Sequence, residues 1–378
     1  MCSEHRSPQM DPEHSSDIEI NLPARRQDDP AAISYYGMPS VKQSHYHWKT
    51  ALSFLAEALG GAPQIIATLI RFFGNRKDHN LVRAGRYLAL ASSLLSPVLL
   101  ISELHTPRRW FYMLRIFRRT SSMCIGNMSL TTFGIFSGMT AIGQMLEDYG
   151  YTTTGRRIST AFSLPAAAAG GMICLYPGTE LEETCTPLWT ASHPLLSPLI
   201  ASTGFSCGAA ALAIAAQHMH VSDQGHKQLN NLASMTLGVQ LAIALLTEGA
   251  WRNNPSGRSY QASVHALAYR FGIGIGILFP LVLRFNRMWT GKRLPNREVA
   301  ASTATIAGGF LLYNAVLEAG NQSAANPAEY LEHQQKTELF RGDESTPVQP
   351  GRRWRRIGFS LLAGAGIAFM FLKRRSRR

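Results

Sequence analysis

Long apolar segments alternate with short charged blocks along most of the chain. A helix needs about 20 apolar residues to cross the hydrocarbon core of a bilayer. Eight segments approach or exceed this length, at residues 47–72, 81–104, 121–146, 157–177, 194–217, 229–250, 263–285 and 299–320. The pattern therefore predicts an all-α integral membrane protein, with eight transmembrane helices in a domain that covers residues 45–320.

The rest of the chain flanks this domain. Residues 1–44 are acidic, polar and contain Pro, which predicts a disordered arm rather than a secretory signal. Residues 321–353 are expected to form a polar linker. A shorter apolar segment at residues 357–372 lies between "RRWRR" and "KRRSRR". Because Lys and Arg side chains snorkel from helix ends, we expect residues 354–378 to form a ninth transmembrane helix with a basic tail.

Charge and cysteine content narrow the function. Only 16% of the residues are charged, compared with about a quarter in average globular chains. The formal charge of +13 comes from Lys and Arg at the ends of apolar segments, where they set topology, so we expect no nucleic-acid binding. The five cysteines form no CxxC pair. Iron–sulfur and zinc sites need grouped thiolates or Cys/His clusters, so the chain is expected to hold neither.

Basic residues also favour one orientation. They cluster in the loops after the first and seventh segments, for example at Arg71, Arg76, Lys77, Arg284 and Arg287. The positive-inside rule then predicts a multi-pass protein of the cell inner membrane, with a periplasmic N-terminus and a cytoplasmic C-terminus. The loop after the second segment is an exception, since it carries Arg108, Arg109, Arg115, Arg118 and Arg119 on the other side.

Polar side chains collect on the side of the membrane where the first helix begins. Alternating spans place there four carboxylates near helix ends (Glu103, Glu180, Glu248 and Glu318) and five imidazoles (His45, His47, His105, His193 and His265). Each residue alone fits an ordinary interfacial role. Their convergence indicates proton chemistry at this rim of the protein.

The first helix carries a polar row. Thr50, Glu57, Gln64 and Arg71 recur every seven residues and drift by only about 20° per step, so they share a helix face. The row covers about 31 Å, close to the thickness of the bilayer core. A carboxylate within the membrane usually serves a function, so Glu57 and Gln64 are candidates for a proton path. The alternative is a hydrogen-bonded structural role for Glu57.

Five stretches together resemble a known family. They are "YYGMPSVKQSHYHWKTALSFLAEALGGAP", "SELHTPRRWFYMLRIFRRTSSMCIGNMSL", "LYPGTELEETCTPLW", "SPLIASTGFSCGAAAL" and "GGFLLYNAVLEAGNQSA". In this order, over about residues 35–325, they are similar to the polysulfide-reductase membrane subunit family, also called NrfD-like. The resemblance implies two four-helix bundles that bind quinone or quinol without a redox cofactor. It also implies an iron–sulfur (ferredoxin-like) partner subunit and a catalytic, often molybdopterin, subunit.

The resemblance also implies a set of site residues. Tyr176 matches a Tyr that contacts quinone in the family, and His47, or less securely His45, matches a polar position that opens the first helix near the quinone. Glu103 replaces the usual Asp before a Leu-x-x-Pro turn.

Three further positions are less regular. Asn127 lies where the family often has Trp or Ser. Tyr313 stands where many members have Arg, and Pro177 replaces Thr.

The expected mechanism combines these residues. Tyr176 and His47 would serve the two quinone oxygens, and Glu103 or His105 would pass protons to water. Three other readings remain: a proton-coupled transporter, a haem-bearing cytochrome subunit, and a structural membrane anchor of a redox complex.

Overall fold

The chain folds into helices of very different lengths. The computed structural model describes residues 43–74, 78–104, 106–115, 118, 121–254, 257–290 and 294–326. In chain order the elements are α1 (Trp48–Phe73), α2 (His79–Glu103), η4 (Pro107–Arg109), α3 (Tyr112–Arg115), α4 (Ser122–Asp148), α5 (Thr152–Glu182), α6 (Pro187–Ala191), α7 (Leu196–Gln217), α8 (Asp223–Arg252), α9 (Arg258–Gln261), α10 (Val264–Ile273), η6 (Gly274–Leu278), α11 (Phe279–Thr290) and α12 (Pro295–Ala325). These described segments contain no strand, which confirms the all-α prediction for them.

Seven helices within the described ranges are long and apolar enough to cross a membrane, and the chain is a multi-pass membrane protein. They are α1, α2, α5, α7, α8, the continuous α10–η6–α11 helix and α12. The helix α4 has 27 residues but carries Ser, Thr, Asn and Gln along its length, and it is not among the seven. The arrangement of eight spans as two four-helix bundles stays a prediction.

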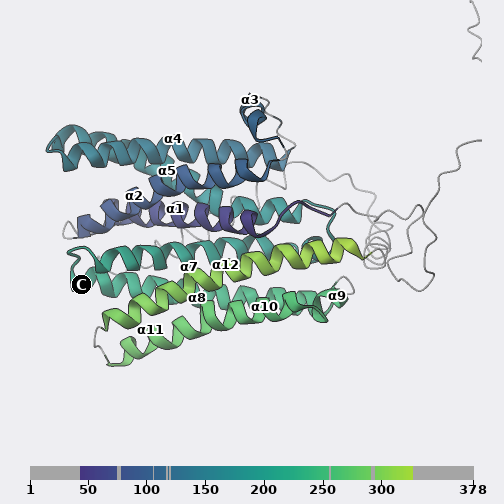
Figure 1. Cartoon of the computed structure of the whole chain (residues 1–378). Helices are drawn as coiled ribbons and strands as arrows, with labels where there is room; N and C mark the ends of the chain where they lie inside the picture. The colour runs from purple at the N-terminus through teal and green to yellow at the C-terminus, as the bar shows by residue number, and fades with distance from the viewer. Residues whose placement is uncertain are drawn as a thin grey trace, which may run out of the picture.

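The long helices lie side by side (Figure 1), and two groups of them are in contact through α7, which packs against α1 and α5 as well as against α8 and α12. In one group α1 packs against α2 and α5, and α4 packs against α5 and α2. In the other, α12 packs against α7 and α10, and α8 packs against α7. Small residues allow close approach, as in other membrane helices. A Cβ atom on Gly170 of α5 would lie 2.8 Å from the carbonyl oxygen of Gly61 of α1.

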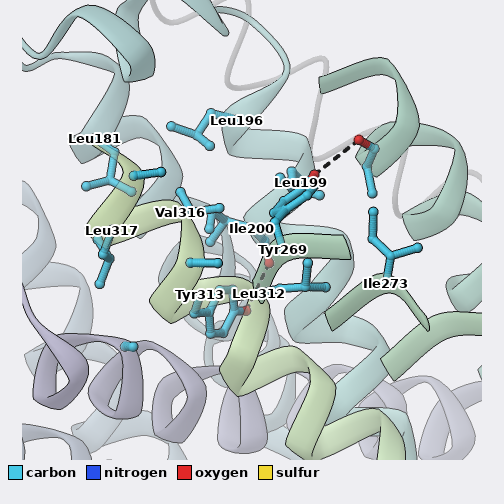
Figure 2. Close-up of a cluster of buried hydrophobic side chains, with 14 of the residues drawn as sticks. Leu181, Leu196, Leu199, Ile200, Tyr269, Ile273, Leu312, Tyr313, Val316 and Leu317 are labelled. Atoms are coloured by element: carbon cyan, nitrogen blue, oxygen red, sulfur yellow. Dashed lines mark hydrogen bonds between the residues drawn. The ribbon is translucent and has the colours of Figure 1, made fainter. Parts of the chain in front are cut away.

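A buried cluster holds α7, α10 and α12 together. Figure 2 shows Tyr313 of α12 among Ile200, Leu312 and Val316. The Tyr313 hydroxyl donates a 3.0 Å hydrogen bond to the carbonyl oxygen of Ile200. Tyr313 therefore serves as a packing residue where related sequences were expected to have Arg.

Helix ends differ from the expected ones more than helix positions do. The fourth predicted helix ended at residue 177, but α5 continues to Glu182, so Glu180 lies inside a helix rather than after it. The last predicted span of the domain ended at residue 320, but α12 continues to Ala325, into the expected linker, so Glu318 is not a helix-end residue. The rest of the linker, the ninth helix and the arm up to residue 42 lie outside the described residues.

Candidate functional site

A large cavity opens at the end of the molecule where α1 begins. Its volume is about 1160 Å³. The walls come from the segment before α1, the first turns of α1, the C-terminal halves of α2 and α5, the N-terminal half of α4, and the connection that contains η4 and α3. Apolar atoms make up most of the lining surface, and most of these segments also contribute polar side chains, as expected of a site for an organic ligand.

One side of the cavity carries two phenols and a carboxylate. Tyr46, just before α1, donates a 2.9 Å hydrogen bond from its hydroxyl to Oε1 of Glu180 on α5. Tyr176 lies one helical turn before Glu180 and interacts electrostatically with it. Burial, reinforced by the negative charge of Glu180, raises the pKa of Tyr46 well above its ordinary value. The Tyr46 phenol therefore stays protonated and remains a hydrogen-bond donor.

The ring of Tyr176 lies directly on the backbone of α4 at Gly126. A Cβ atom at Gly126 would overlap the Tyr176 ring and its hydroxyl oxygen. A glycine at this position is what allows the phenol to lie between α4 and α5 at the cavity wall.

Two carboxylates of the cavity are bonded within the same group of helices. Glu103, the last residue of α2, accepts a short hydrogen bond from the Thr50 hydroxyl of α1. Glu57, two turns deeper on α1 than Thr50, accepts a 3.0 Å hydrogen bond from the Ser96 hydroxyl of α2. Only 4% of Glu57 is exposed, yet it lines the cavity, so any proton exchange of this carboxyl has to pass through the cavity or the protein interior.

A histidine links the cavity to a second hollow. His47 Nδ1 lies 3.2 Å from Oε1 of Glu318 on α12. The second hollow has a volume of about 540 Å³ and is also lined by both of these residues, together with His45, His265 and Asn321. Asn321 accepts a 2.5 Å hydrogen bond from the Ser44 hydroxyl. It also donates a 2.8 Å bond to the Tyr46 carbonyl oxygen, which fixes the segment before α1 over the cavity.

The structure brings most of the expected site residues to this cavity. Its lining includes Tyr176, His47, Glu103, His45, Asn127 and Glu57. His105 lies outside the described residues. Gln64 lies deeper, where its side chain bonds Thr68 at 3.4 Å and Thr140 at 3.5 Å. The Asn127 amide points to the Met113 sulfur of α3, at 3.3 Å.

The remaining polar residues of this end are distributed elsewhere. Glu248 is not among the residues that line the cavity, and forms ion pairs with Arg252 at 2.7 Å and Arg270 at 2.8 Å. His193 pairs with Glu182 at 3.1 Å. The expected convergence of the four carboxylates on one site therefore holds for Glu103, Glu180 and Glu318, which line the cavity, and not for Glu248.

Sequence reasoning placed Glu180 at this end of the molecule but did not pair it with Tyr176, and it left Tyr46 out of the expected site. Glu180 follows Tyr176 by four residues, a spacing that puts both on one face of a helix. The signal was missed because the helix was expected to end at residue 177. Tyr46 has no such signal, since its bond to Glu180 depends on how α1 packs against α5.

A buried polar network lies at the opposite end of α1, α2, α4 and α5. Arg86 of α2 is 1% exposed, donates a 2.7 Å hydrogen bond to Gln144 of α4, and lies 3.6 Å from Glu147. Glu147 also accepts a 2.7 Å bond from the Ser159 hydroxyl of α5. Arg71, the last member of the polar row on α1, donates a 3.1 Å bond to the Thr160 hydroxyl of α5. The row therefore runs between the cavity and this network.

The geometry includes no candidate metal centre within the described ranges, where no group of three or more His, Cys, Asp or Glu side chains is placed to hold an ion. In comparison with known families, a model described as polysulfide reductase, of the NrfD type, matches residues 32–326. A search of curated proteins gave no match. The family match covers all the helices described above.

Proposed function

The chain belongs to the polysulfide reductase family, and we propose that it exchanges electrons between the quinone pool and an iron–sulfur partner subunit. Membership of the family makes the chain a membrane subunit of a redox complex. The observation that supports the finer proposal is the cavity of about 1160 Å³, whose lining surface is mostly apolar and carries polar groups that include Tyr176, Glu180 and His47. A quinone needs this combination, because its ring is apolar and its two oxygens must exchange protons.

The proposed chemistry divides the two quinol hydroxyls between two parts of the wall. Tyr176 hydrogen-bonds one oxygen, and the adjacent Glu180 accepts the proton that leaves it. His47 accepts the proton from the other oxygen and passes it to Glu318, which also borders the outer hollow. Each quinol loses two protons and two electrons, and the electrons leave to the partner. The reverse sequence reduces a quinone.

The proposed partner docks on the same end of the molecule. Arg108 and Arg109 are exposed on η4, beside the cavity wall formed by Trp110. A partner that docks on this basic surface brings its iron–sulfur cluster close to the quinone, which shortens the path for electrons. The basic surface favours a partner with acidic residues around that cluster. The complex then includes a catalytic subunit, of the molybdopterin type in the resembled family. We place the complex in the cell inner membrane, with the cavity on the periplasmic side.

The polar row of α1 is proposed to carry protons between the cavity and the opposite network. Glu57 faces the cavity, and Gln64 bonds Thr140 on the way to Arg86 and Gln144. Seven residues of helix separate Glu57 from Gln64, about 10 Å of rise. Water has to bridge this gap, because no hydrogen bond is that long.

The test is to purify the full-length chain with its natural partners in mild detergent. We expect an iron–sulfur subunit to copurify, quinone to be extracted from the sample, and added quinol to reduce an artificial acceptor dye. A complex that contains the partners but neither binds quinone nor oxidises quinol would instead support a structural anchor. A chain that purifies alone and moves solutes would support a transporter. A sharp visible haem band would support a cytochrome subunit.

A further inference from the structure

One part of the cavity is lined by residues of α2 and α4, and we call this part the groove. On α2 its lining runs along one face through Ser93, Pro97 and Leu100 to Leu104. On α4 it runs through Asn127 and Leu130 to Gly134. These spacings of three and four residues place each set on one stripe of its helix. From Ser93 to Leu104, the residue that follows α2, the stripe spans 11 residue steps, or about 16 Å, roughly half of the hydrocarbon core.

The groove lies at the boundary between the protein interior and the lipid. On α2, Ser92 and Ser96 are buried and Leu94 is 64% exposed, while the groove residues Ser93 and Pro97 between them are half-buried.

The same order holds on α4. Phe133 is fully buried, Ile135 is 59% exposed, and Leu130 and Gly134 are half-buried. The groove therefore opens toward the lipid and not toward water.

We propose that this groove holds the isoprenoid tail of the quinone, and that the ring enters the polar part of the cavity from the lipid between α2 and α4. The proposal rests on the proposed function and adds the route and the tail site to it. A polyisoprenoid chain needs apolar contact and no hydrogen-bond partner, which matches the side chains of Pro97, Leu100 and Leu130. The groove is continuous with the wall that carries Tyr176, so ring and tail can be bound at the same time.

Glycine at position 134 keeps the groove wide. A Cβ atom at Gly134 would meet no other atom within 4 Å, and the residue lines the cavity. Gly138, one turn further along α4, also has nothing within 4 Å of an added Cβ, but it does not line the cavity. The two positions give a matched pair, because an added Cβ atom meets nothing within 4 Å at either, and only the side chain at position 134 would enter the groove.

The experiment measures quinone affinity in lipid nanodiscs that contain the full chain with its partners. The probes are a long-tailed ubiquinone and a tail-less analogue with the same ring, detected through quenching of tryptophan fluorescence. Trp48 and Trp110 line the cavity and act as reporters. We expect Gly134→Leu to weaken the long-tailed quinone about tenfold, the effect of losing about two buried methylene groups. The tail-less analogue should keep its affinity within about twofold.

The comparison variants make the result decisive. Gly138→Leu should change neither affinity, and Gly134→Ala should weaken the long-tailed quinone less than Gly134→Leu does. Unchanged affinity of Gly134→Leu for the long-tailed quinone would overturn the proposal, and a lipid chain would then be the occupant of the groove. An equal loss for both probes would also overturn it. A wild-type complex that binds neither probe would overturn the proposed function together with the groove.

Discussion

Two tyrosines show how the same side chain serves the site in one place and the fold in another. Tyr176 lines the cavity beside Glu180, whereas Tyr313 is buried in the core and donates its hydroxyl to the Ile200 carbonyl oxygen. Both keep their rings when changed to Phe, so the substitution removes only a hydroxyl. The pair therefore compares the hydroxyl proposed to act in catalysis with one that is buried in the core.

We predict that Tyr176→Phe lowers quinol oxidation by the complex about a hundredfold, because it removes the hydroxyl that is proposed to hydrogen-bond one quinone oxygen while Glu180 takes the proton from it. Tyr313→Phe should leave the rate within about twofold while it lowers the stability of the protein by about 1 kcal/mol, the usual value of one hydrogen bond. Dye-coupled turnover and thermal melting in detergent measure the two effects. Full activity of Tyr176→Phe would remove this phenol from the site.

Gly126 controls the same site without any polar group of its own. We predict that Gly126→Ala displaces the Tyr176 ring, since an added Cβ atom would overlap it. The KM for quinol should rise about tenfold, a cost of about 1.4 kcal/mol that lies within the range for overpacking. Gly138→Ala on the same helix is the control, because its Cβ atom meets nothing within 4 Å. Equal KM values in both variants would show that Tyr176 does not depend on this contact.

At the scale of the helix, α1 joins the cavity to the opposite network through its buried face. Thr50, Glu57 and Gln64 are at most 4% exposed, and each is hydrogen-bonded within the first group of helices. A buried carboxyl in such a row serves either proton transfer or structure. Replacing the carboxyl group by an amide affects these two roles differently.

We predict that Glu57→Gln keeps quinol oxidation within about twofold but lowers proton transfer across proteoliposome membranes by more than about tenfold, because an amide cannot carry the proton. Glu248→Gln is the control, because this carboxylate lies on α8, away from the polar row of α1, and forms ion pairs with Arg252 and Arg270. A pH-sensitive dye inside the vesicles reports the transfer. Unchanged transfer together with a lower melting temperature would assign Glu57 a structural role.

The pattern of apolar segments predicted where the helices lie, because backbone groups in lipid must bond within their own helix. It predicted their ends less well. The stretch "PGTELE", residues 177–182, reads as a loop, yet α5 continues through it. Its acids are satisfied by partners from elsewhere in the chain: Glu180 by Tyr46, and Glu182 by the backbone N–H of Ser197 and by His193. Such distant contacts carry no local signal.

For the candidate site, too, the sequence predicted the position in the molecule and not the detailed structure. Alternating topology was enough to place Tyr176, Glu103 and His47 at one end of the molecule, and the structure puts all three on the wall of one cavity. The shape of that cavity was not predictable, because it depends on how α2 and α4 pack and on the contact between Tyr176 and Gly126. Periodicity gives the direction of a side chain along its helix but not the space beside it.

At the scale of the whole molecule, exposed arginines lie at both ends of the first group of helices. Arg108 and Arg109 lie on η4 beside the cavity, and Arg156 and Arg157 lie near the start of α5, at the other end. In the proposed orientation the second pair lies at the cytoplasmic end, as the positive-inside rule expects, and the first pair is the exception to that rule. A docked acidic partner explains the exception, and contact with lipid headgroups is the competing explanation.

We predict that the double variant Arg108→Gln, Arg109→Gln loses the iron–sulfur subunit during purification while the chain itself still inserts in the membrane. The wild-type complex should keep the partner at 0.15 M salt, because charges less than about 8 Å apart are only partly screened at that concentration. It should lose the partner at higher salt concentrations. Arg156→Gln with Arg157→Gln removes the same charge from the opposite end and should retain the partner. If both double variants retain the partner equally at every salt concentration, the arginines beside the cavity contact lipid headgroups, and the partner binds through other residues at this end.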